Sequence, residues 1–217
     1  MTGMIEAVDA AKPGLRLLKR AARLIARGEV LVCPTDTGYA LSANAIDSRA
    51  IARVFNLKGR SFSNPIHVAV SSIEEAGKYA QLNDAARYLA GKFLPGALTL
   101  ILPKKDIIPD LLVGGLDTIG IRIPNNKVIL RLAELTGRPL TATSANISGQ
   151  PTPYAVEEIG EVVEKVALVL DQGPLRVREL STIVDMTVEP PQLIRQGRVS
   201  WLDIVQVLKL RKSADSK

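Results

Sequence analysis

The sequence has few of the residues that build the commonest catalytic and metal centres. It contains one cysteine, Cys33, and one histidine, His67, among 217 residues. A zinc site of cysteine and histidine ligands is therefore nearly excluded, and so is a disulfide framework. A serine triad would have to use His67, whose Pro-Ile-His-Val-Ala-Val context favours a half-buried strand histidine that bonds to the backbone. The single cysteine suits a reducing cytosol, so we expect a cytoplasmic protein.

Aromatic residues, long apolar runs and glycine-rich phosphate motifs are also scarce. The chain has three Phe, one Trp and four Tyr, which is poor material for stacking single-stranded bases. No run approaches the ~20 apolar residues of a membrane span, and the first twelve residues lack the apolar core of a signal peptide. A Walker A motif, a dinucleotide fingerprint and a Gly-x-Ser-x-Gly elbow are all missing. We therefore expect no membrane partner and none of these enzyme classes.

Basic residues, in contrast, exceed acidic ones and give a net charge of +6. An anionic partner is indicated, and a small phosphorylated ligand fits at least as well as a nucleic acid. Part of this charge lies on one face of a helix predicted over 13–27. That face is more often simply solvated, and RNA docking is the alternative. Its cations are Lys12, Arg16, Lys19, Arg20, Arg23 and Arg27.

Hydrophobic periodicity predicts an alternation of helices and strands over most of the chain. The expected helices cover 13–27, 47–57, 72–80, 83–91, 127–135, 157–165 and a final one from 201. The expected strands cover 30–33, 65–70, 98–102, 117–124, 166–170, 181–188 and 193–195, and a further short strand starts near Pro139 and ends before Thr143. We expect 104–115 to be a loop and 211–217 a tail. The pattern is typical of an α/β domain over 1–217, with a core of about 13–202 and a sheet of mixed strand direction flanked by helices.

Residues 138–150, Arg-Pro-Leu-Thr-Ala-Thr-Ser-Ala-Asn-Ile-Ser-Gly-Gln, depart from the apolar pattern of a buried strand. Hydroxyl and amide side chains at a strand end, followed by a glycine, can close on an anionic ligand. Taken alone, the same residues also make an ordinary polar turn.

Cations and hydroxyls recur at the other predicted strand ends. Lys58 and Arg60 precede Asn64, and the period of a strand puts Thr118 and Arg122 on one face. Phosphoryl and nucleotidyl transfer need positioning and cations rather than a protein nucleophile. The chain offers no plausible nucleophile, so this collection predicts phosphate chemistry.

Several motifs in order resemble the YrdC-domain family. They are Pro34-Thr35-Asp36-Thr37, Lys58-Gly59-Arg60 with Asn64-Pro65, Leu116-Asp117-Thr118 leading to Arg122, Thr143-Ser144-Ala145-Asn146, Ser181-Thr182-Ile183, and Val188-Glu189-Pro190-Pro191 leading to Arg195. The resemblance implies a twisted open sheet of mixed parallel and antiparallel strands around a concave, positively charged face. It implies an enzyme, a nucleotidyltransferase that makes threonylcarbamoyl-AMP and pyrophosphate from L-threonine, bicarbonate and ATP with Mg²⁺. Proteins that transfer the threonylcarbamoyl group to position 37 of tRNA would follow.

The same resemblance assigns roles residue by residue. Lys58 and Arg60 would be catalytic, and Mg²⁺ would be carried by ATP without direct side-chain ligands. The ATP-binding residues would be Arg60, Asn64, Thr118, Ser144, Asn146, Thr152 and Arg195. The threonine-binding residues would be Thr37, His67, Arg122, Ala142 and Ser181. His67 is included because Ala69 stands where many family members have histidine.

Two other functions remain open from the residues. The Gly38-Tyr39-Ala40-Leu41 string is closer to the YciO branch, which suggests a protein that binds tRNA or double-stranded RNA without robust synthase activity. Ser144-Ala145-Asn146 favours the synthases instead. A domain that handles carbamoyl adenylate, as in hydrogenase maturation, is the third possibility.

Overall fold

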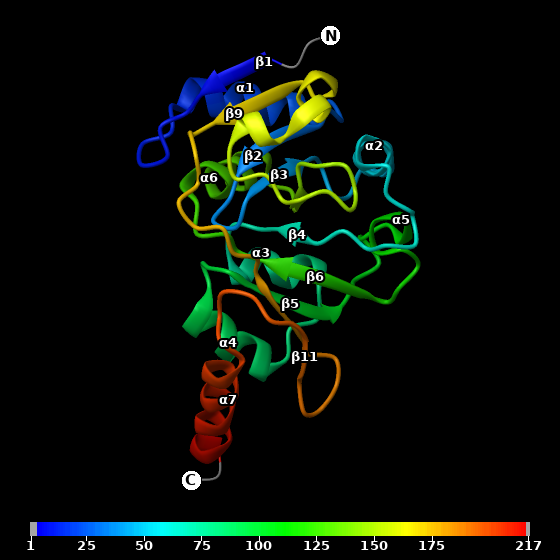
Figure 1. The fold of residues 1–217 in the computed structure, drawn as a ribbon. Helices are drawn as coiled ribbons and strands as arrows, with labels where there is room; N and C mark the ends of the chain where they lie inside the picture. The colour runs from blue at the N-terminus through cyan, green and yellow to red at the C-terminus, as the bar shows by residue number, and fades with distance from the viewer. Residues whose placement is uncertain (1–3, 216–217) are drawn as a thin grey trace.

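The strands form two mixed sheets that lie one beyond the other along the molecule (Figure 1). The computed structural model describes residues 4–215. The five-stranded sheet has the order β1 (Met4–Ala7), β9 (Leu168–Asp171), β2 (Leu31–Pro34), β3 (Tyr39–Ser42) and β8 (Thr143–Ser144). The six-stranded sheet has the order β11 (Gln192–Arg195), β10 (Thr182–Asp185), β5 (Leu98–Pro103), β6 (Thr118–Arg122), β4 (Val68–Ala69) and β7 (Leu140–Thr141). The predicted mixed α/β fold is confirmed, with its strands divided between two sheets.

Each sheet contains both parallel and antiparallel pairs. In the first, β9 runs parallel to β1 and β2, while β3 is antiparallel to β2 and β8. In the second, β10 is parallel to β5 but antiparallel to β11, as expected for strands joined by a short proline-containing turn. Strands β5 and β6 are antiparallel, and β4 is parallel to β6 and antiparallel to β7.

The described chain contains α-helices of four to fifteen residues, and several of them begin at a capping side chain. They are α1 (Leu15–Ala26), α2 (Ser48–Lys58), α3 (Ile73–Tyr79), α4 (Asp84–Phe93), α5 (Asp110–Val113), α6 (Lys127–Thr136) and α7 (Trp201–Asp215). The side chains of Asp47, Ser72 and Asn83 accept backbone N–H bonds from the first turns of α2, α3 and α4. Each of these caps satisfies a donor that the helix itself cannot, and the three helices begin at the residues where the sequence analysis expected them.

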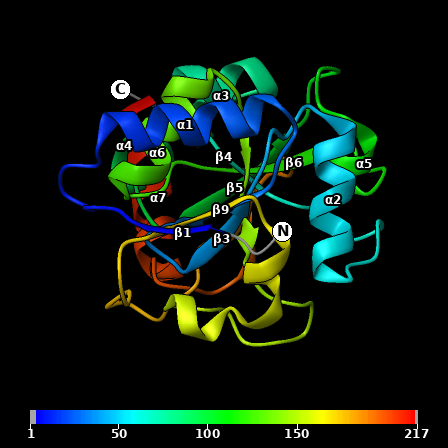
Figure 2. The same ribbon diagram turned by 90° about the horizontal axis from the view of Figure 1, so that it is seen from above.

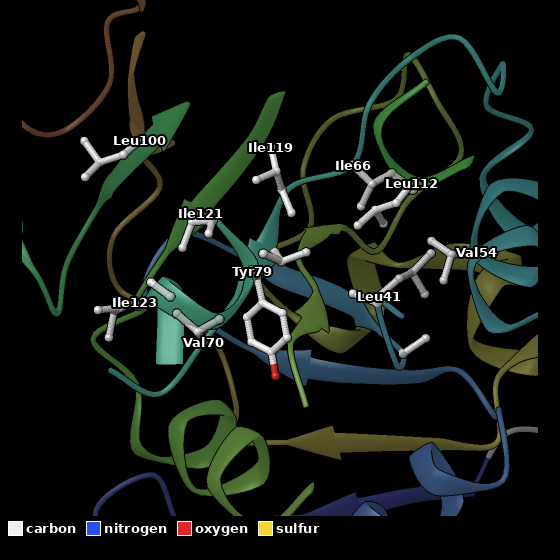
Figure 3. Close-up of a cluster of buried hydrophobic side chains, with 14 of the residues drawn as sticks. Leu41, Val54, Ile66, Val70, Tyr79, Leu100, Leu112, Ile119, Ile121 and Ile123 are labelled. Atoms are coloured by element: carbon white, nitrogen blue, oxygen red, sulfur yellow. The ribbon is translucent and has the colours of Figure 1, made fainter. Parts of the chain in front are cut away.

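Helices α1 and α6 cover one side of the five-stranded sheet, and the 3₁₀ turns near residue 160 lie on the other side (Figure 2). Leu18 and Ile25 of α1 pack with Leu132 of α6 and with Leu31 of β2. A larger cluster joins the second sheet to α2, α3, α4 and α5 (Figure 3). Helix α7 packs on α4 at the end of the molecule far from β1. No helix among residues 4–215 is long and apolar enough to span a bilayer.

Several predicted elements differ in the structure. The expected loop 104–115 contains α5, whose Leu112 is fully buried. The expected helix 157–165 is instead two 3₁₀ segments, Val156–Glu158 and Gly160–Lys165, and Gly160 begins the second one at a positive φ. Helix α7 continues to Asp215, so the predicted tail is wrong for 211–215, while 216–217 lie outside the described residues. Strands β1 and β3 are absent from the predicted elements, and neither shows apolar alternation.

The chain crosses from one sheet to the other within the polar stretch 138–150. Strand β7 belongs to the six-stranded sheet, β8 belongs to the five-stranded one, and Ala142 alone separates them. The Thr141 hydroxyl accepts the Ala43 N–H at 2.9 Å and donates to the Leu41 carbonyl at 2.9 Å. A buried threonine is therefore required here because it satisfies backbone groups of the neighbouring sheet.

We expect the unpredicted helix α5 to matter for stability. Leu112 is 0% exposed, whereas Leu116, just after the helix, is 49% exposed. Leu112→Ala should lower the free energy of unfolding by about 2–5 kcal/mol, because it leaves a cavity in the core. Leu116→Ala should change it by less than about 0.5 kcal/mol. Urea denaturation of the two variants measures both values, and equal effects would contradict the packing of α5.

Candidate active site

A cavity of about 190 Å³ opens at the junction of the two sheets. The turn between β2 and β3 forms one wall, and the crossing segment around Ala142 forms another. Residues from β6, from β11, from the loop before β4 and from the segments around Arg60, Thr152 and Ser181 complete it. The lining residues are Thr35, Thr37, Gly38, Tyr39, Ala40, Arg60, Pro65, Ile66, His67, Arg122, Ala142, Thr143, Ser144, Thr152, Leu180, Ser181 and Arg195.

Two arginines of the cavity are held by uncharged acceptors. Arg60 donates from Nε to the Asn64 carbonyl at 3.1 Å and from Nη2 to the Pro65 carbonyl at 3.0 Å. Arg195 donates from Nε and Nη2 to the Ser181 carbonyl, at 3.2 and 2.9 Å, and from Nη2 to the Ser181 hydroxyl at 3.1 Å. Burial lowers the pKa of both guanidinium groups, yet arginine stays protonated in proteins. Both side chains therefore present a full positive charge.

The third arginine, Arg122, differs because a carboxylate compensates it. Its Nη2 donates to Asp36 at 2.6 Å, and its Nη1 donates to the Thr37 hydroxyl at 2.5 Å. The side chains of Arg122 and Asp36 are 7% and 8% exposed. Nε of Arg122 is buried and has no hydrogen-bond partner. An orphaned guanidinium donor beside a polar cavity is a place where an anionic oxygen can bind.

His67 reaches the cavity from the loop just before β4. Burial lowers the pKa of its imidazole to about 4, and the neighbouring Arg195, Arg122 and Arg60 add to this effect. A side chain at Gly120 of β6 would meet the imidazole, since a Cβ built there lies 2.4 Å from Cδ2 of His67. His67 is therefore a neutral group with a fixed orientation at neutral pH.

Lys58 lies behind the cavity wall rather than in it. Its ammonium donates to the Ser144 carbonyl at 2.5 Å, the Asn146 carbonyl at 3.0 Å and the Asn146 Oδ1 at 2.8 Å. Burial lowers its pKa to about 8. The amide of Asn146 is also saturated, because its Nδ2 donates to the carbonyls of Gln150 and Pro151. Lys58 and Asn146 thus fix the turn that presents Ser144.

The structure brings nine of the predicted site residues together around the cavity. These are Thr37, Arg60, His67, Arg122, Ala142, Ser144, Thr152, Ser181 and Arg195. Lys58 and Asn146 support them from behind. Asn64 is exposed and contributes its carbonyl to Arg60, and Thr118 lies half-buried at the start of β6, four residues from Arg122.

The sequence analysis gave no site role to eight of the lining residues: Thr35, Gly38, Tyr39, Ala40, Pro65, Ile66, Thr143 and Leu180. Asp36, the partner of Arg122, was quoted as part of a motif but given no role. A charged residue between two threonines, directly after a buried strand, was the signal that could have identified it.

The donor set of the cavity does not suit a metal ion bound by the protein. None of its lining residues is acidic. No group of three or more His, Cys, Asp or Glu residues within 4–215 could hold a metal ion. A divalent cation would therefore have to arrive on the phosphates of a ligand, because hard cations prefer oxygen ligands with charge.

Comparison with known proteins places this chain and its fold in a defined family. Residues 23–197 match the Sua5_yciO_yrdC family model, whose description is "Telomere recombination". The chain belongs to this family.

Among its relatives, the threonylcarbamoyl-AMP synthase of Pyrococcus abyssi is 39% identical over 193 residues. That match covers 88% of this chain but 57% of the relative, so the chain spans little more than half of that protein. A Methanocaldococcus jannaschii relative is 43% identical over 187 residues, and the match covers 86% of each chain.

Solved structures agree. P. abyssi Sua5 complexed with L-threonine superposes with a TM-score of 0.89 at 37% identity, over 94% of this chain and 60% of that one. Escherichia coli YciO gives a TM-score of 0.82 at 27% identity, over 91% and 97% of the two chains. Sequence identity therefore favours the synthases over the YciO branch.

The neutral state of His67 can be measured without ambiguity, because the protein has one histidine. We expect NMR of the ring to show no protonation between pH 8 and about 5.5, since its pKa is lowered to about 4. The unfolded chain takes up the proton near pH 6.5. The free energy of unfolding should therefore fall as the pH drops from about 6.5 towards 4. His67→Gln should show a smaller fall, and a ring that titrates near pH 6.5 would contradict this environment.

Proposed function

We propose that this protein forms threonylcarbamoyl-AMP and pyrophosphate from L-threonine, bicarbonate and ATP. The observation that carries the proposal is the arrangement of three arginines in one cavity. Arg60 and Arg195 keep uncompensated charge, and Arg122 has a free buried Nε. Such a cavity offers a place for a polyphosphate beside a place for one carboxylate. The relatives named as synthases and the related structure complexed with L-threonine support this reading.

The amino-acid end would be the part of the cavity around Arg122. Its Nε would bind the threonine carboxylate. His67, neutral and fixed, and Ser181 would face the polar groups of the substrate, with Thr37 and Ala142 beside them. The Ser181 hydroxyl is itself held by Thr99 at 2.9 Å and by Arg195. A buried polar pocket of this kind should discriminate against analogues that leave its groups unpaired.

The nucleotide end would be formed by Arg60, Arg195, Ser144 and Thr152, with Asn64 and Thr118 nearby. Arginine suits bidentate contacts to phosphate oxygens. ATP would be a substrate, and Mg²⁺ would come with it, since the cavity lining has no carboxylate. When bound, Mg²⁺ would neutralise phosphate charge that the arginines alone do not.

The reaction requires several anionic groups in one place. The deprotonated threonine amine either adds CO₂ and loses a proton, or condenses with bicarbonate and releases water; both routes give a carbamate. A carbamate oxygen then attacks the α-phosphorus of ATP, and the bond to the β,γ-pyrophosphate breaks with its electron pair. Arg60 and Arg195 would lower the repulsion between attacker and leaving group, which makes the protein a nucleotidyltransferase. The product would pass to enzymes that modify tRNA, in a cytoplasmic setting that the buried thiol of Cys33 fits.

We expect Arg60→Ala to reduce ATP-dependent pyrophosphate release by about 10²–10³, or about 3–4 kcal/mol of transition-state stabilisation. Release in the unaltered protein should require both threonine and bicarbonate. Arg49→Ala is the matched control, because Arg49 is exposed on α2, the helix that leads to Arg60. Near-normal release by Arg60→Ala, or release without threonine, would contradict the proposal.

A second candidate function is RNA binding, favoured by the cations on α1. Lys12, Arg16, Lys19, Arg23 and Arg27 are exposed at helical spacing, and the first turn of α1 has no acidic residue. Arg20, expected to belong to this face, is instead half-buried and pairs with Glu6. Like charges three or four residues apart destabilise a helix slightly. An external polyanion would remove that repulsion.

If α1 binds tRNA or double-stranded RNA, log K should fall steeply with log salt concentration. The triple variant Arg16→Ala, Lys19→Ala, Arg23→Ala should reduce that slope by about 2–3, at close to 0.9 per lost contact. ATP should not affect it. Arg49→Ala serves again as the control, and an unchanged slope in the triple variant would exclude α1 as the binding surface.

A further inference from the structure

The three arginines of the cavity are not equivalent, and Asp36 makes the difference. The hydrogen bonds of Arg60 and Arg195 end on carbonyl and hydroxyl oxygens. Among the described residues, the one ion pair that involves a cavity arginine joins Arg122 to Asp36. The uncompensated positive charge of the cavity is therefore carried by Arg60 and Arg195.

Asp36 is fixed before any ligand arrives. It lies in the turn between β2 and β3, where the Thr35 hydroxyl donates to the Gly38 carbonyl at 2.7 Å and accepts the Thr37 N–H at 3.1 Å. The Thr35 N–H also donates to the Gly38 carbonyl at 3.1 Å. Asp36 does not line the cavity. Any effect it has on a ligand must therefore pass through Arg122.

We propose that Asp36 is a positioning and specificity-determining residue that keeps polyphosphate away from the amino-acid end of the cavity. The inference rests on the proposed function. A nucleotide or pyrophosphate is attracted by every uncompensated arginine within reach. Asp36 cancels the charge of Arg122 and accepts from its Nη2, while the Thr37 hydroxyl accepts from its Nη1. The Nε side of the guanidinium is then left for a zwitterion with a single carboxylate. The polyanion is left to Arg60 and Arg195.

By this account, Asp36 prevents a phosphate group from occupying the place of the amino acid beside Arg122. The cavity is small, about 190 Å³, so a phosphate group on Arg122 would occupy the place of the amino acid. Specificity of this kind depends on making the wrong occupant unfavourable as well as the right one favourable. The Arg122–Asp36 pair has no net charge, so it favours the net-neutral threonine zwitterion over a polyanion.

Calorimetric titration of L-threonine at increasing inorganic pyrophosphate tests the inference. In the unaltered protein, threonine affinity should change less than twofold as pyrophosphate rises. In Asp36→Asn, pyrophosphate should compete, and threonine affinity should fall at least tenfold. Asp36→Glu should restore the resistance, because it returns the carboxylate. Glu29→Gln, which removes a carboxylate from the surface pair with Arg53, should behave as the unaltered protein.

The outcomes separate the two proposals. Competition by pyrophosphate in the unaltered protein overturns the inference even if Asp36→Asn fails to fold, which circular dichroism reports. An Asp36→Asn protein that binds threonine and resists pyrophosphate also overturns it, and leaves the proposed function intact. If neither the unaltered protein nor Asp36→Asn binds threonine and ATP, the proposed function itself is overturned.

Discussion

The buried ion pair between Arg122 and Asp36 connects the two sheets, and the shape of the cavity depends on it. Arg122 ends β6 of the six-stranded sheet, and Asp36 follows β2 of the five-stranded one. Taking a guanidinium out of water is costly unless it is paired, and breaking such a pair costs about 3–5 kcal/mol. The two sheets are thus held in an arrangement that places Nη1 of Arg122 2.5 Å from the Thr37 hydroxyl oxygen. The pair adds to the hydrogen bonds of Thr141, which also join the two sheets.

The other cationic side chains near this pair donate hydrogen bonds to uncharged oxygen atoms. Lys58, Arg60 and Arg195 are all bonded to backbone carbonyls. Carbonyl dipoles orient a cation without neutralising it, so the field remains available for a ligand. The cost of desolvation appears in the lowered pKa values of these groups. A protein that only needed stability would have no reason to gather unpaired cations in one hollow.

The sequence predicted most of what depends on local pattern. Helix caps at Asp47, Ser72 and Asn83 could be foreseen because capping needs one side chain and three neighbouring residues. The division into two sheets could not, because Ala142 does not show that the chain changes sheets there. The sequence also could not show that Lys58 supports the cavity wall, because a lysine in such a motif equally predicts a contact with the ligand. Its four oxygen acceptors come from residues 86 and 88 positions away. Which cation pairs with a carboxylate depends on the tertiary fold. The sequence motif shows the residues next to Asp36 but not its partner Arg122.

The buried thiol of Cys33 offers a practical handle on this molecule. Cys33 is 0% exposed, and burial raises its pKa to about 12, so almost none of it is thiolate at neutral pH. Thiol reagents should therefore leave the native protein unlabelled. Leu180, 37% exposed at the cavity rim, could be replaced by cysteine to create a single reactive position. The fluorescence of a label attached there would report ligand binding, with no signal from a second labelled cysteine.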